Sequence, residues 1–278
     1  MVNEYTDLIQ KAKELAILSF KKFVNKLGYN EEAFEHIYNI NITLDNLKLE
    51  NATYDHVSNL IILDKGYVDD AFMCILLKPE EENKYIVDIG KTIVHEMIHA
   101  NRMIMINYDS TVYSKDYSER PNINDKPSGI EEARPVKSNI LKVVSEYDLK
   151  YNGREESLSS EKTIKSQFNL EEALTSVISV IMIMTRKSDD LDIEPAINRI
   201  KEIDAYDSAE KATALLIEKH GVELLKWFMT STYDDVYYNY FLNKYGEDYD
   251  KLVKYIASGY DKYDSSSQER AERIVNKH

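Results

Sequence analysis

The stretch His95-Glu96-Met97-Ile98-His99 sets the interpretation of the whole chain. It lies inside a segment, roughly residues 88–105, whose apolar residues recur at helical spacing over a wide face: Ile93, Val94, Met97, Ile98 and Met103. A helix that is apolar over such a wide face is normally buried in the protein core. The sequence therefore predicts a buried helix that carries two histidines and a glutamate.

The spacing of these polar residues suits metal chemistry. His95 and His99 are four residues apart, so both imidazoles project from one face of a helix. One tetrahedral Zn²⁺ accepts two such nitrogens at about 2.0–2.1 Å each. Glu96 lies about 100° round the helix from His95, where it can take a proton from water without binding the metal itself. A carboxylate in that position suits a general base.

The residues HEMIH resemble the active-site helix of the zincin metallopeptidases. The resemblance implies that His95 and His99 bind Zn²⁺ and that Glu96 is the general base and acid. It also implies a two-lobe fold and a peptide or protein substrate, hydrolysed by a zinc-activated water. The metzincin branch of that family has another histidine soon after the motif. This chain continues Ala100-Asn101-Arg102 with no histidine nearby, so that branch is excluded.

A peptidase zinc site needs a third protein ligand. The segment Asn169-Leu170-Glu171-Glu172-Ala173-Leu174-Thr175 is similar to the third-ligand helix of gluzincin-like families, which aligns Glu172 with the ligand. In that alignment Glu172, Ser176 and Ser179 form one narrow polar stripe on an apolar helix, where a carboxylate needs a strong partner such as a metal.

Other carboxylates compete for this role. Glu171 is the nearest alternative to Glu172. Glu131 and Glu132 form a similar pair, but Arg134-Pro135 follows directly and argues against a continuous helix through them. The spacing leaves Glu172 as the first choice and Glu171 as the second.

Other residues are further candidates for a role in the same site. Peptide deformylases use the motif with a cysteine ligand, but their Gly-Cys-Leu context is absent around Cys74, which we expect to be a buried strand residue. An oxyanion donor could be His220 or one of the tyrosines Tyr233, Tyr237, Tyr238 and Tyr240. Capping of a helix end before Gly221 also explains His220, and packing also explains the tyrosines. Thr175 could orient a ligand.

The remaining pattern predicts an α+β fold that is predominantly helical. Residues 7–27 have the spacing of an amphipathic helix that stops at Gly28. Short apolar runs predict strands at residues 40–44, 60–63 and 71–77. We expect a single zincin-like domain with three parts: an α/β lobe with a small sheet over about 1–106, an irregular segment over about 107–165 that includes a short helix from Pro135 to about Tyr147, and a helical lobe over about 166–278.

Composition excludes several kinds of partner. The formal net charge is −14, and nucleic-acid binding draws its affinity from Lys and Arg, so neither a nucleic acid nor an anionic membrane is expected. Lys11, Lys13 and Glu14 interrupt the first apolar stretch and no later run reaches the length of a membrane span. With Cys74 as the only cysteine, no internal disulfide is possible. We expect a cytoplasmic protein, and the sequence makes no prediction of its oligomeric state.

Three functional hypotheses follow from these residues. The first is a gluzincin-like zinc peptidase. The second is a non-catalytic zinc-binding or regulatory module on the same scaffold, which would have the same ligands but no turnover. The third is a structural helical protein with an accidental motif, which predicts no metal and tolerance of His99→Ala.

Overall fold

The computed structural model describes residues 2–47, 50–55, 58–112, 157–203, 206–230, 240–259 and 263–278. These residues form two compact units. The first contains Met1–Asn101 and Ser179–Asp192, and the second contains Arg102–Ile178 and Ile193–His278.

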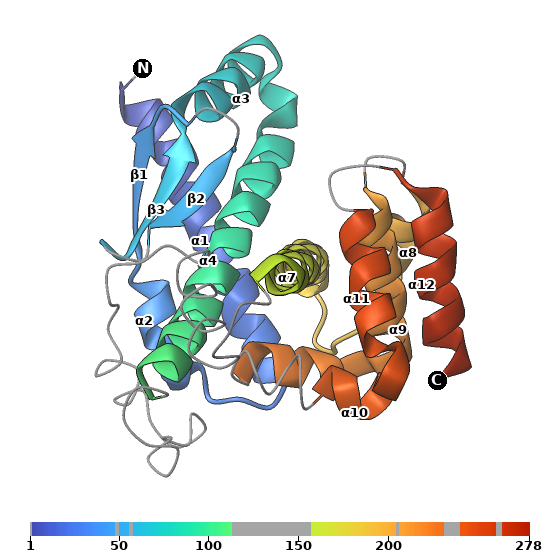
Figure 1. The fold of residues 1–278 in the computed structure, drawn as a ribbon. Coiled ribbons are helices and arrows are strands. Elements are labelled where there is room, and N and C mark those ends of the chain that lie inside the picture. Colours follow the sequence, from blue (N-terminus) through green and yellow to red (C-terminus); the bar gives the residue numbers. More distant parts are fainter. Residues whose placement is uncertain are drawn as a thin grey trace. The chain divides into compact units, whose positions relative to one another are not determined.

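The first unit combines helices with a small sheet (Figure 1). Its helices are α1 (Val2–Lys26), the short α2 (Glu35–Tyr38), α3 (Lys65–Leu77) and most of α4 (Glu82–Val112), with single 3-10 turns at Glu31–Phe34 and Pro79–Glu81. The strands are β1 (Asn41–Asp45), β2 (Ala52–Asp55) and β3 (Leu60–Asp64), in the order β1-β3-β2. β1 pairs with β3 in parallel and β2 pairs with β3 antiparallel, so β3 is central and has the most apolar strand sequence.

Helix α1 confirms the amphipathic pattern. Leu8, Ala12 and Phe23 are buried, as the helical spacing requires, and the helix begins at Val2, earlier than the predicted residue 7. It ends at Lys26 because Gly28 adopts a positive φ of 84°, a conformation that glycine reaches without steric cost.

The predicted strand at residues 71–77 is wrong, because this run forms the second half of α3. Asp64 starts the helix as its N-cap, and its carboxylate accepts a hydrogen bond from the backbone N–H of Tyr67 at 2.8 Å. Short apolar runs fit a strand and a helix equally well, and here the capping residue decides. Cys74 is consequently an exposed helix residue and not a buried strand residue.

Helix α4 packs closely on α1 at Gly90. A Cβ atom at this position would lie 2.7 Å from Cδ2 of Leu15 and 3.3 Å from the carbonyl oxygen of Ala12. Only glycine allows so close an approach, and it fixes the start of α4 against α1 little more than one turn before His95.

The second unit is helical. Its elements are the end of α4, part of α7 (Ser157–Thr185), α8 (Glu194–Glu202), α9 (Ser208–Thr230), α10 (Leu242–Tyr245) with a 3-10 turn at Gly246–Asp248, α11 (Tyr249–Ser258) and α12 (Ser265–Lys277). Helices α8, α11 and α12 all pack on α9 (Figure 1). Gly221 bends α9 with φ 58° and ψ −140°. The predominantly helical α+β class is confirmed.

Both ends of the segment predicted to be irregular are helical. Helix α4 continues to Val112 and α7 already begins at Ser157, so the edges of the range 107–165 are helical. The predicted short helix from Pro135 to Tyr147 lies outside the described residues.

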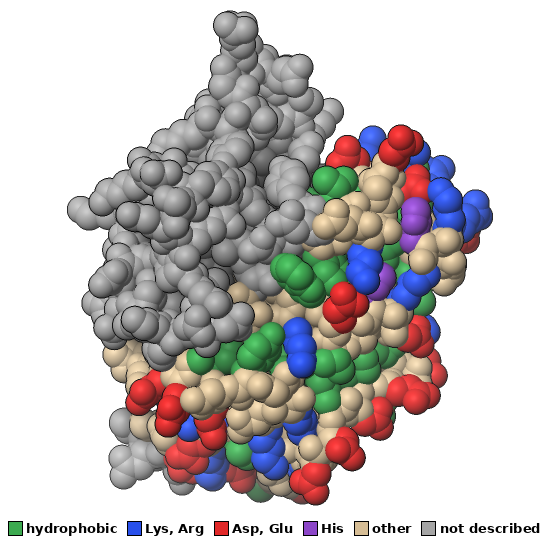
Figure 2. Space-filling view, turned by 90° about the horizontal axis from the view of Figure 1, so that it is seen from below, with side chains coloured by type: hydrophobic (Ala, Val, Ile, Leu, Met, Phe, Trp, Pro, Cys, Tyr) green, Lys and Arg blue, Asp and Glu red, His purple; other side chains and the backbone are tan. Residues whose placement is uncertain are grey.

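The described surface carries both signs of charge. On the face drawn in Figure 2, acidic and basic side chains are interspersed along the rim, with apolar side chains between them. Within the described helices, none combines the length and the apolar character that a membrane crossing requires.

Candidate metal centre

Helix α4 brings its two histidines together. The Nε2 atoms of His95 and His99 lie 2.9 Å apart, and the ring centroids lie 4.6 Å apart at an angle of 68°. From Ile93 to Arg102 every residue is buried except His95, which is partly exposed. Two nitrogens at this distance either share one proton as a hydrogen bond or face a common cation.

Helix α7 supplies the third candidate. Between Leu170 and Ile183 every residue is buried except Glu172 and Ser176, which are partly exposed and lie one turn apart. The narrow polar stripe expected on this helix is therefore present, although Ser179, its third member, is buried.

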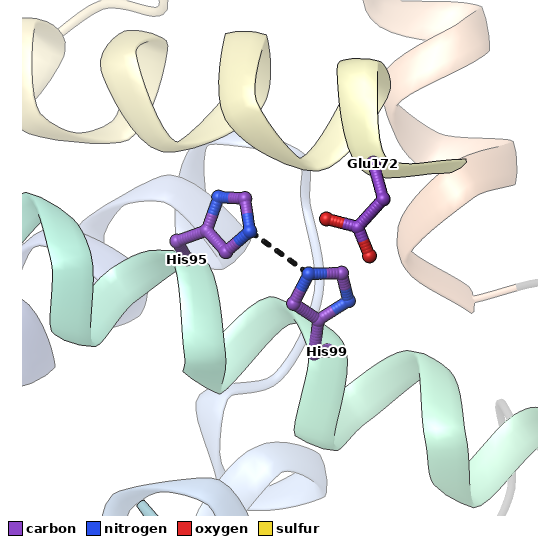
Figure 3. Close-up of side chains that lie close together, drawn as sticks. All are labelled: His95, His99 and Glu172. Carbon is purple, nitrogen blue, oxygen red and sulfur yellow. Dashed lines mark hydrogen bonds between the residues drawn. The ribbon is translucent and has the colours of Figure 1, made fainter. Parts of the chain in front are cut away.

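The three predicted ligands form one cluster (Figure 3). One nitrogen from each of His95 and His99 and one carboxylate oxygen of Glu172 all lie within 4.8 Å of one another. Two ligands of a tetrahedral Zn²⁺ lie about 3.3 Å apart, because each ligand bond is about 2.0–2.1 Å long. The donor types and their spacing fit such an ion after small side-chain adjustments. Zinc also accepts this combination of two imidazoles and a carboxylate in catalytic sites.

Glu96 lies on the same helix between the two histidines and is buried, with 7% of its surface exposed. A buried carboxylate is costly unless polar groups or a charge compensate it. His95, the residue before Glu96, is the partly exposed position in this part of the helix. The role of Glu96 in proton transfer stays a prediction.

Glu171, the alternative ligand, has a different partner. Its Oε1 accepts a hydrogen bond from Nε of Arg102 at 2.8 Å, and both side chains are almost fully buried. Nη1 of Arg102 also donates to the carbonyl oxygen of Phe228 at 3.0 Å, and the guanidinium lies 4.8 Å from the centre of the Phe228 ring. Glu171 is not part of the cluster that Glu172 forms with the histidines.

Buried ionisable side chains gather on the two helices of this cluster. Among the described residues they are Glu96, His99 and Arg102 on α4, Glu171 on α7 and Lys211 on α9. Burying a charge is costly, and of these residues Arg102 and Glu171 compensate each other as an ion pair.

The other candidates fall into different surroundings. Nε2 of His220 and the hydroxyl of Tyr245 are hydrogen-bonded at 2.5 Å. Burial, and then the charge of Lys244, hold the pKa of His220 below its ordinary value, so this imidazole stays neutral. Tyr240 is buried against the His220 ring. The hydrogen bond of His220 with Tyr245 and its ring contact with Tyr240 are typical of side-chain packing.

Five candidate site residues lie outside the described residues: Tyr233, Tyr237, Tyr238, Glu131 and Glu132. The Thr175 hydroxyl is buried without a hydrogen-bond partner among the described residues, so a role in orienting a ligand stays a prediction.

Sequence reasoning missed Arg102. This residue lies three positions after His99, so a helical wheel places it near the motif, but its partner Glu171 is 69 residues away. Nothing in the spacing of one helix identifies a partner on another.

Comparisons of the chain with protein-family models, with curated proteins and with solved structures find no match.

Proposed function

We propose that this protein is a zinc-dependent metallopeptidase with a zincin-like two-lobe architecture, which binds Zn²⁺ through His95, His99 and Glu172. The observation that carries the proposal is the convergence of two imidazole nitrogens and one carboxylate oxygen within 4.8 Å. The order of the motif on α4 adds a glutamate at the position suited to a general base.

The chain's own residues supply the remaining chemistry. A bound Zn²⁺ would provide a Lewis acid for the scissile carbonyl and would lower the pKa of water at the site. Glu96 accepts a proton from the attacking water and returns it to the leaving amine. A Zn²⁺ held by the imidazoles of His95 and His99 and the carboxylate of Glu172 would keep a net positive charge, which would favour an electron-rich carbonyl oxygen.

Access to the cluster supports catalysis over a purely structural role. His95 and Glu172 are each partly exposed, whereas the residues around them on both helices, except Ser176, are buried. Closed structural zinc sites use four protein ligands, and a catalytic site keeps one position open. Among the described residues the cluster has three donors, two of them partly exposed, which fits the second kind. The proposed substrate is a peptide or protein, and a cytoplasmic location is part of the same proposal.

The first test is the metal content of the purified protein by elemental mass spectrometry, measured in parallel for His99→Ala, Glu172→Ala and the control His220→Ala. We expect about one equivalent of zinc in the parent and the control, and none in the two cluster variants. Zinc retained by Glu172→Ala but lost by His99→Ala would move the third ligand, first to Glu171. No metal in any preparation, and no uptake of added zinc, would overturn the proposal.

The second test is cleavage of a peptide library by the zinc-loaded protein. Cleavage that disappears on chelation and returns with zinc supports the peptidase. One equivalent of zinc with no cleavage would instead favour the non-catalytic zinc-binding module.

A further inference from the structure

Two adjacent glutamates on α7 have different partners. Glu171 is bonded to Arg102, and Glu172 lies with the histidines. Successive residues on a helix point about 100° apart, so a rotation of α7 by that angle would exchange the two carboxylates. The rotation of α7 therefore decides which of the two carboxylates lies with the histidines.

Arg102 is placed to hold this rotation. It follows His99 by three residues on α4, which is about 4.5 Å along the axis, and Glu171 directly precedes Glu172 on α7. The bond from Arg102 to Glu171 therefore joins the two helices within one turn of the candidate ligands. Its length is 2.8 Å, and the two side chains are 1% and 6% exposed, so water does not weaken it.

Arg102 is itself fixed in position. Its guanidinium donates a second hydrogen bond to the carbonyl oxygen of Phe228 on α9 and lies over the ring of the same residue. A planar guanidinium held from two directions offers a carboxylate only a narrow range of positions. The carboxylate of Glu171 occupies that place.

We infer that Arg102 and Glu171 form a positioning pair, which sets the rotation of α7 so that Glu172, and not Glu171, faces His95 and His99. This inference rests on the proposed zinc site. Buried ion pairs contribute little to stability compared with apolar residues of similar size, but they can specify one arrangement over another. Residues that orient metal ligands typically change metal affinity about 10–100-fold when they are removed.

The test replaces both charges at once. In the double variant Arg102→Met/Glu171→Leu, neither charge of the pair is left buried without the other, so we expect the metal-free protein to unfold at nearly the parent temperature. We expect its zinc affinity, measured by competition with a chromogenic chelator, to fall about 10–100-fold. The visible absorption of bound Co²⁺ should also change, because it reports the coordination of the ion. A matched control is Lys201→Met/Glu218→Leu, which removes an exposed ion pair at 3.0 Å and should leave all three measurements unchanged.

The outcomes separate this inference from the proposed function. Zinc affinity and Co²⁺ absorption equal to those of the parent would overturn the positioning role and leave the zinc site intact. A parent protein that binds no zinc would overturn both. If the double variant does not fold, Glu171→Asp replaces it: this variant keeps the charge and shortens the side chain by one methylene, so weaker zinc binding in a folded protein supports the inference and unchanged binding overturns it.

Discussion

The histidines on α4 and on α9 differ in the side chains that surround them, and these side chains determine what each imidazole can do. On α4, His95 and His99 face each other at 2.9 Å with the Glu172 carboxylate close by. On α9, His220 meets the hydroxyl of Tyr245 and the ring of Tyr240. Around the α4 histidines there are a negative charge and several donor atoms, which a cation requires. Around His220 on α9 there are a neutral phenol and the edges of aromatic rings, which suit packing.

The two regions also differ in their buried charge. Around the α4 histidines the buried residues include Glu96, Arg102 and Glu171, whereas around His220 the buried neighbours are aromatic. Charges are buried at a cost that only mutual compensation or a ligand offsets. We therefore expect substitutions near α4 to change chemistry as well as stability, and those near His220 to change stability alone.

The largest expected effect is on turnover. Glu96→Gln should keep about one equivalent of zinc and reduce cleavage of a peptide substrate by about 10²–10⁴-fold, because the amide cannot accept a proton. His220→Gln, the matched change in the other region, should leave cleavage unchanged. Full activity in Glu96→Gln would remove the general-base role, and a loss in His220→Gln would remove the contrast between the regions.

The second largest expected effect is on the free energy of unfolding, through the buried ion pair of Arg102 and Glu171. Arg102→Met alone leaves the Glu171 charge buried without the guanidinium, so we expect the free energy of unfolding to fall by about 3–5 kcal/mol. Lys201→Met breaks an exposed pair with Glu218 and should cost less than about 1 kcal/mol. Urea denaturation of the metal-free proteins measures both. Equal losses would show that burial does not distinguish the two pairs.

His36 shows what burial does to an imidazole without a hydrogen-bond partner among the described residues. Nε2 of His36 is buried and has no hydrogen-bond partner among the described residues, and burial lowers the pKa of His36 to about 4. The unfolded chain, with a pKa near 6.5, binds the proton more readily than the folded protein. Stability is therefore complete above about pH 6.5 and is lost as the pH falls towards 4, by about 2 kcal/mol between pH 7 and pH 5.

Denaturation of the metal-free protein at both pH values, beside His36→Gln, isolates this contribution. Using metal-free protein keeps zinc release from the α4 histidines out of the measurement. The same loss of stability in His36→Gln as in the parent would assign the acid sensitivity to other groups.

The smallest expected effect concerns the bend after His220. Gly221 has φ 58° and ψ −140°, a region almost restricted to glycine, and an added Cβ would meet nothing within 4 Å. Gly221→Ala should therefore lower the free energy of unfolding by about 1–2 kcal/mol through backbone strain alone. Its neighbour Val222 is 39% exposed, and Val222→Ala should stay within about 0.5 kcal/mol. Zinc content should be unchanged in both, and a loss would connect this region to the metal centre.

Periodic segments of the fold were predictable from the sequence. The helices around residues 7–27 and 88–105 and the strands at 40–44 and 60–63 follow from regular apolar spacing, which reports the side of an element that packs inward. The run at 71–77 was assigned wrongly because seven apolar residues have no clear period, and β2 was missed because Ala52–Asp55 is short and mostly polar. Apolar sequence also did not ensure burial, since Leu77 is 78% exposed.

The sequence by itself determined what lies within one helix. Four residues of spacing place His95 and His99 on one face whatever the rest of the chain does, because the helical repeat is local. The tertiary structure decided what requires a second helix: that Glu172 joins the histidines, that Glu171 is bonded to Arg102, and that His220 meets phenols. Adjacent residues on a helix point about 100° apart, so the choice between two neighbouring carboxylates depends on the rotation at which the helices pack, and no local pattern encodes that angle.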